Sequence, residues 1–200
     1  MNIGIIGTGS LGSTFGQLFC KNLHKVMFTC KRQEGLHTFT QAIGPNAFYG
    51  SVEDVLQFAD IHVIAIPFME LQNLAAQCER FTTGKVLIDT TRPCPEGKKM
   101  LVDNRFINGS QNNYLSRLFP NAYLAKAFDV HPAEVIKRFA FNSLEHQKLT
   151  IPFTANHPEV KQIVENLISH LGFIPEFQPI LRNKTIDIAK NRKIEERLKS

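Results

Sequence analysis

Short apolar runs alternate with longer amphipathic segments along this chain of 200 residues. The apolar runs predict strands over residues 3–6, 25–30, 47–50, 60–67, 85–89, 123–128, 148–153 and 173–177. Apolar residues at helical spacing predict helices over residues 13–23, 69–81, 113–119, 132–139 and 158–171, with another starting at residue 51 and a last one over 185–199. The strands are apolar throughout rather than alternating, as expected when helices cover both faces of a sheet. The pattern therefore predicts an α/β fold with a mostly parallel sheet in a single compact domain.

Two of the predicted helices carry recognisable start signals. Ser51 precedes Asp54 by three residues, which is the spacing of a capping box. Pro158 suits the first turn of a helix because no N–H is needed there, and Gly172 suits the residue just past its end.

A glycine-rich sequence follows the first predicted strand. Residues 7–12 read Gly-Thr-Gly-Ser-Leu-Gly, which fits G-x-G-x-x-G directly after a strand and at the start of a helix. Here Gly7 permits a tight turn, Gly9 lets the backbone approach a pyrophosphate, and Gly12 lets helix and strand pack closely. Backbone N–H groups at the helix start would face the phosphates. We therefore predict a Rossmann-type, doubly wound fold that binds a dinucleotide, the alternative being a structural turn without a ligand.

The end of the second predicted strand indicates which dinucleotide is bound. Sites for NAD usually place Asp or Glu about 20 residues beyond the fingerprint, where the carboxylate bonds the ribose 2′-OH. This chain has Thr29, Cys30, Lys31 and Arg32 there, and Glu34 lies past the turn. Cationic side chains can pair with a 2′-phosphate, and Arg32 can also stack on the adenine. We predict NADP(H) rather than NAD(H); the alternative is that both cations are solvated turn residues.

The positive charge of the chain is concentrated at its C-terminus. Residues 182–200 hold seven Lys or Arg against three Asp or Glu, and so carry +4 of the total formal charge of +5. The nearly neutral remainder argues against a broad nucleic-acid surface. We interpret residues 1–182 as an NADP-binding Rossmann domain and 183–200 as a C-terminal basic helix with a solvated charged face, contact with an acidic partner being the alternative.

Cysteine spacing and hydropathy limit the other classes of protein. Cys20, Cys30, Cys78 and Cys94 form no C-x-x-C pair, so we expect no metal site. No apolar run approaches the roughly 20 residues needed to cross a bilayer, and the chain begins with a strand rather than a leader. We expect a soluble cytoplasmic protein with reduced thiols, and no membrane partner.

With these residues in view, the chain resembles the NADP oxidoreductases that use the deazaflavin coenzyme F420. The nucleotide-binding domain of the STEAP metalloreductases is similar to the same family. The resemblance runs in order through "TCKRQ", "DIHVIAIPF", "KVLIDTTRP", "LAKAFDVHPAE" and "NHPEVKQIVENLISHLGFIPEFQPILRN", and covers most of residues 1–182. It implies hydride transfer between NADPH and a flavin-like or deazaflavin acceptor such as F420, FMN or FAD.

The resemblance also implies a set of cofactor-binding residues at the carboxyl ends of successive strands, where α/β sheets bind ligands. The pyrophosphate would be held by Thr8, Gly9, Ser10 and Leu11. The 2′-phosphate would be held by Thr29, Cys30, Lys31 and Arg32. The nicotinamide side would be lined by Ile66, Pro67, Phe68, Ile88 and Ala127.

The sequence gives weaker indications about catalytic residues. Hydride transfer between stacked rings needs orientation more than acid–base help. A small carbonyl acceptor would need a proton donor, for which Asp129 and His131 are the candidates. The family commonly has Asn or His where Asp129 stands, so the chain departs from the family at this position.

Two further questions stay open in the sequence. A non-catalytic NADP(H)-binding module, sensing redox state or acting through a partner, would carry the same fingerprint as an enzyme. Only about one predicted helix follows the last strand, so there is no room for the large helical domain of imine reductases unless a partner chain supplies it. This helix could instead pack on a second subunit. We therefore expect a homodimer that acts on a small-molecule acceptor.

Overall fold

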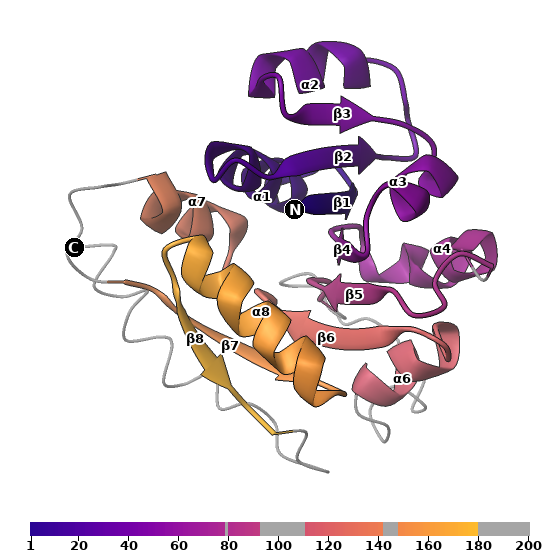
Figure 1. Ribbon diagram of the computed structural model, residues 1–200, viewed down its shortest axis with the longest axis vertical. Coiled ribbons are helices and arrows are strands. Elements are labelled where there is room, and N and C mark those ends of the chain that lie inside the picture. Colours follow the sequence, from indigo (N-terminus) through magenta and orange to yellow (C-terminus); the bar gives the residue numbers. More distant parts are fainter. Residues whose placement is uncertain (79, 93–110, 142–147, 180–200) are drawn as a thin grey trace.

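The computed structural model describes residues 1–78, 80–92, 111–141 and 148–179 (Figure 1). The strands are β1 (Asn2–Ile6), β2 (Lys25–Thr29), β3 (Ala47–Tyr49), β4 (Ile61–Ile64), β5 (Val86–Asp89), β6 (Tyr123–Ala127), β7 (Thr150–Ala155) and β8 (Ile174–Phe177). The helices are α1 (Ser10–Lys21), α2 (Leu36–Ile43), α3 (Val52–Phe58), the 3₁₀ turn η1 (Phe68–Glu70), α4 (Leu71–Cys78), α6 (Gln111–Leu118), α7 (Ala133–Phe141) and α8 (Pro158–His170).

The eight strands form one sheet in the order β3-β2-β1-β4-β5-β6-β7-β8. Strands β1 to β6 are parallel; β7 pairs antiparallel with β6, and β8 runs parallel to β7. The first six strands have the order of a Rossmann fold, and the predicted fold class is confirmed. The chain fills one side of β1 first and then crosses to β4 on the other side. This reversal opens a crevice at the carboxyl ends of β1 and β4, which is where such sheets bind ligands.

Helices cover both faces of the sheet, and each face has its own apolar core. One core packs α1, α7 and α8 against strand residues such as Ile5, Val63 and Ile88. The other packs α3, α4 and α6 against residues such as Ile64 and Leu87 (Figure 1). Neighbouring strand residues point to opposite faces, so both of them are buried, which explains why the strands read as continuous apolar runs.

Several local predictions are confirmed, and some boundaries move. Ser51 and Asp54 form the expected capping box, and Pro158 starts α8. Helix α1 begins at Ser10, three residues before the predicted start, and β4 ends at Ile64 instead of reaching residue 67. Helix α2 was not predicted at all; it begins after a glycine and has no side-chain cap.

Part of the sequence-based picture lies outside the described residues. The predictions that fall outside are the last helix over 185–199, the boundary at residue 182, the homodimer contact assigned to that helix, and most of the loop over 90–112 with Cys94. Within the described residues, no helix is both long and apolar enough to cross a membrane.

Candidate functional site

The glycine-rich loop joins β1 to α1 and is fixed by close backbone contacts. The N–H of Gly7 donates to the carbonyl of Thr29 at 2.8 Å, which ties the loop to the end of β2. Gly7 has a φ of 111°, and a Cβ there would lie 2.2 Å from the carbonyl oxygen of Ala65. A Cβ on Gly12 would lie 2.0 Å from the carbonyl oxygen of Gly7. Both positions therefore need glycine for the fold itself.

Gly9 differs from the other two glycines of the loop. A Cβ there would meet nothing within 4 Å, and its φ of −66° suits any residue. Gly9 is the N-cap of α1, yet no side chain caps this helix and no acidic residue lies in its first turn. The N–H groups of the first turn are therefore available to an anion, as in dinucleotide sites. Of the loop residues assigned to the pyrophosphate, Gly9 and Ser10 are exposed, and Thr8 and Leu11 are half-buried.

The end of β2 presents the residues predicted to hold the 2′-phosphate. Thr29 is only 1% exposed, and its hydroxyl has no partner in the described part of the chain. The Cys30 thiol donates to the carbonyl of Arg32 at 2.7 Å, which shapes the turn. The side chains of Lys31 and Arg32 are exposed just past the carboxyl end of β2, which we call the rim of the site, and Glu34 is exposed past the turn. This rim therefore offers two exposed cations close to the fingerprint loop, whereas the unpartnered Thr29 hydroxyl is buried.

One carboxylate at this rim was not predicted from the sequence. Glu70, at the end of η1, places Oε1 3.5 Å from Nζ of Lys31. A hydrogen bond from Asn73, and secondarily the charge of Lys31, lower the pKa of Glu70, so it is ionised at neutral pH. The two partners are 39 residues apart in the chain, and no local pattern in the sequence connects them. A bound phosphate would compete with Glu70 for Lys31.

On the nicotinamide side, the structure divides the predicted residues into two groups. Ile66 is half-buried and Pro67 is exposed just beyond β4. Phe68, Ile88 and Ala127 are at most 7% exposed. Phe68 packs against the ring of Tyr114, with the centroids 5.6 Å apart. These three buried side chains belong to the apolar core, so they support this edge of the site from inside the fold.

A buried charged cluster lies at the carboxyl ends of β5 and β6. Nζ of Lys126 donates to Oδ2 of Asp89 at 2.8 Å and to the carbonyl of Thr91 at 2.7 Å. The other oxygen of Asp89 accepts the N–H of Thr91 at 2.9 Å. Asp129 completes the cluster, with Oδ2 3.7 Å from Nζ of Lys126. The sequence placed Asp89 and Lys126 at the ends of two strands, and this shared position is the signal that could have paired them.

The two candidate catalytic residues have different surroundings. His131 is 3% exposed, and its Nε2 lies 3.1 Å from the carbonyl oxygen of Thr150, so the ring is held inside the fold. The side chain of Asp129 is 17% exposed. Of the two, Asp129 is the group that a ligand at this edge can reach. No three His, Cys, Asp or Glu side chains gather as a metal site among the described residues.

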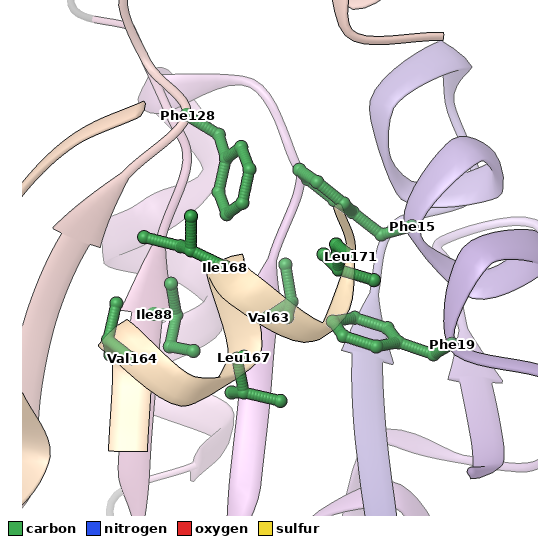
Figure 2. Close-up of a pocket in the computed structure, with 9 residues that line it drawn as sticks. All are labelled: Phe15, Phe19, Val63, Ile88, Phe128, Val164, Leu167, Ile168 and Leu171. Atoms are coloured by element: carbon green, nitrogen blue, oxygen red, sulfur yellow. The ribbon is translucent and has the colours of Figure 1, made fainter. Parts of the chain in front are cut away.

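Two hollows in the described part of the chain are lined by neither the glycine-rich loop nor the end of β2. A cavity of about 10 Å³ lies between the sheet, α1 and α8, and its lining is entirely apolar, including Phe15, Ile88 and Phe128 (Figure 2). It has room for about one water molecule and offers no polar partner, so we expect it to be dry. A shallower hollow of about 320 Å³ lies beside the C-terminal ends of α1 and α2, away from the glycine-rich loop.

The strand order, the glycine-rich loop and the uncapped helix start define a dinucleotide-binding Rossmann protein. Residues 2–93, which include β1 to β5, match the model of the family described as NADP oxidoreductase, coenzyme F420-dependent. Over residues 2–93 the chain is therefore similar to a family of NADP-dependent oxidoreductases, and the resemblance predicted from the sequence is confirmed over this segment. No curated protein sequence matches the chain significantly.

Solved structures share the fold across most of the chain. A hypothetical protein of Sinorhizobium meliloti is 24% identical with a TM-score of 0.76, over 90% of this chain and 85% of that one. A protein of Arthrobacter sp. FB24, assigned provisionally as an F420-dependent NADP reductase, is 22% identical with a TM-score of 0.74, over 99% and 90%. Pyrroline carboxylate reductase of Plasmodium falciparum, solved with NADP bound, is 13% identical with a TM-score of 0.60, over 89% and 57%.

Proposed function

We propose that this protein is an NADP(H)-dependent oxidoreductase that transfers hydride between NADPH and a flavin-like or deazaflavin acceptor. The main supporting observation is that an open phosphate-binding loop lies close to the cationic rim. Gly9 leaves the helix start open, and Lys31 and Arg32 stand where an NAD site would have a carboxylate. The family match over residues 2–93 supports the same cofactor.

The residues at the rim fit a phosphorylated ribose. Lys31 and Arg32 supply exposed positive charge next to the fingerprint loop. Hydrogen bonds from charged donors to phosphate oxygens are the stronger kind in proteins. An unphosphorylated ribose would leave both cations without a partner on the cofactor.

The proposed reaction needs little acid–base catalysis from side chains. NADPH supplies the hydride when bound; the protein holds the nicotinamide and acceptor rings in contact and limits access of water. Ile66 and Pro67 lie where they can border the nicotinamide ribose, while Phe68, Ile88 and Ala127 fix that edge from the core.

A titration of wild type and variants tests the cofactor. In Lys31→Gln/Arg32→Gln, loss of two charged contacts should raise the Kd for NADPH about 10- to 100-fold, and the Kd for NADH much less, because NADH loses only the stacking of Arg32 on the adenine. Lys25→Gln is a matched control, because Lys25 is exposed at the opposite end of the same strand. Equal affinity of the double variant and wild type for NADPH would contradict the assignment.

An acceptor panel tests the reaction. NADPH oxidation should be measured anaerobically with F420, FMN, FAD, ferric chelates and small quinones. Turnover with a ring acceptor supports the proposal. Tight NADPH binding without turnover on any member would favour a non-catalytic NADP(H)-binding module instead.

A further inference from the structure

Among the described residues, the buried cluster at the ends of β5 and β6 does not balance its charge. It contains two carboxylates, Asp89 and Asp129, and one ammonium, Lys126. Lys126 commits two of its N–H donors to Asp89 and to the carbonyl of Thr91, at 2.8 and 2.7 Å. Asp129 lies 3.7 Å from the same nitrogen, beyond hydrogen-bonding distance. Both carboxylates are paired with the same ammonium, so the described side chains of the cluster carry one net negative charge.

The backbone fixes Asp129 in this place. Phe128 has a φ of 63°, a left-handed conformation that is strained for a bulky residue. Its ring holds the turn in place, since it packs against Phe15 at 4.6 Å and Phe173 at 5.9 Å between centroids. Figure 2 shows the Phe128 and Phe15 rings next to each other in the core, where they meet edge to face. The turn carries the chain back, so that Asp129 approaches Lys126 three residues earlier.

The surroundings make this charge effective. Lys126 and Asp89 are 8% and 2% exposed, and the side chain of Asp129 is 17% exposed. Charges in such partly dry settings act over longer distances than they do in water. Thr91 is 3% exposed beside the cluster, and its hydroxyl has no partner in the described part of the chain. Asp129 is two residues past Ala127, at the sheet edge that the proposed function assigns to the nicotinamide, and its partly exposed carboxylate is close to this edge.

We propose that Asp129 determines which acceptors this site takes: the net negative charge that it gives the cluster favours acceptors that are uncharged near the reacting ring and disfavours anionic ones. The inference rests on the proposed function and adds the charge class of the acceptor. Asp129 acts here as a specificity residue through its field, so neither hydride nor proton passes through it.

Two matched pairs of acceptors test the proposal, because each pair differs in one anionic group. They are 1,4-naphthoquinone against its 2-sulfonate, and riboflavin against FMN. For each pair, the ratio of kcat/KM, neutral over anionic, is measured with NADPH for wild type and Asp129→Asn. The substitution should lower this ratio about three- to tenfold by improving the anionic member, with a larger effect for the sulfonate, whose charge is on the ring itself. The shift should shrink as salt is added.

Controls separate this role from a structural one. Glu134→Gln removes an exposed carboxylate on nearby α7 and should leave the ratio unchanged. Asp129→Glu should restore the wild-type ratio. Equal ratios in wild type and Asp129→Asn would overturn the inference, as would failure of all four acceptors to be reduced or to bind. NADPH titration of the same samples shows whether the proposed function fails as well: intact NADPH binding means that only the acceptor class is wrong.

Discussion

The ammonium of Lys31 lies 3.5 Å from the carboxylate of Glu70, so the cationic rim of the nucleotide site is partly neutralised by the protein itself. Glu70 approaches from the segment after β4, and the side chain of Lys31 is 85% exposed. A surface pair of this kind contributes little to stability. Its effect on a phosphate is clearer, because the carboxylate both occupies Lys31 and repels the incoming anion.

Substitution Glu70→Gln should therefore strengthen NADPH binding. We expect the Kd for NADPH to fall about two- to threefold at low salt, and the Kd for NADH to stay the same. Fluorescence titrations with both nucleotides measure the change, and Glu53→Gln, at an exposed position of α3, is a control for net charge. Weaker NADPH binding in Glu70→Gln would mean that Glu70 helps to position Lys31 for the ligand.

Gly9 and Gly12 should respond in opposite ways to the same added methyl group. Gly12→Ala would place a Cβ 2.0 Å from the carbonyl of Gly7, so we expect a loss of stability of about 2 kcal/mol or more. Gly9→Ala has open space and an ordinary backbone conformation, so the fold should keep its Tm. The methyl would stand where the pyrophosphate approaches, and NADPH affinity should fall at least tenfold. Thermal unfolding and nucleotide titration of both variants check the contrast; wild-type affinity in Gly9→Ala would show that the phosphates do not pass over this residue.

Periodicity and turn chemistry predicted most of the fold, because those signals are local. The strands follow from apolar runs, and the start of α3 follows from Ser51 and Asp54. Helix α2 was missed because it is short and lacks a side-chain cap. The end of β4 was misplaced because the apolar residues Ala65 and Ile66 continue the run after the ladder has ended.

The site was predictable where it depends on one segment and not where it depends on two. The glycine-rich loop and the cationic end of β2 are each contiguous in sequence. The Lys31–Glu70 and Asp89–Lys126 pairs join residues 39 and 37 positions apart. For Asp89 and Lys126 the shared position at two strand ends is a usable signal, whereas the Lys31–Glu70 contact depends on how two loops are placed, which residue patterns do not specify.

His62 should make stability depend on pH. The side chain is fully buried in β4; Nε2 lies 3.1 Å from the carbonyl oxygen of Val55, and Nδ1 has no partner among the described residues. Burial lowers the pKa of His62 to about 4 in the folded protein, from 6.5. The unfolded chain therefore binds the proton more readily between these values. Stability is full above about pH 6.5 and falls as the pH drops toward 4, by about 3 kcal/mol in all.

Urea unfolding across this pH range measures the effect. The free energy of unfolding of wild type should decline on the acid side, and His62→Gln should remove most of the decline. The pKa of His24 is also lowered, by burial first, so His24→Gln should remove a smaller share. A slope unchanged in His62→Gln would mean that His62 does not set the acid stability.

Leu23 and Phe128 share a left-handed backbone with a φ of 63°, but they should respond differently to glycine. Leu23 follows α1 and is 82% exposed, so its side chain contributes little packing. Leu23→Gly should relieve the backbone strain and raise the free energy of unfolding by about 1 kcal/mol, whereas Leu23→Ala keeps the strain and should not. Phe128 is 5% exposed, and the lost ring contacts in Phe128→Gly should outweigh the relief, for a net loss of about 2 to 4 kcal/mol. Urea unfolding of the three variants checks both signs, and a destabilised Leu23→Gly would show that the exposed leucine is held by contacts that its accessibility does not reveal.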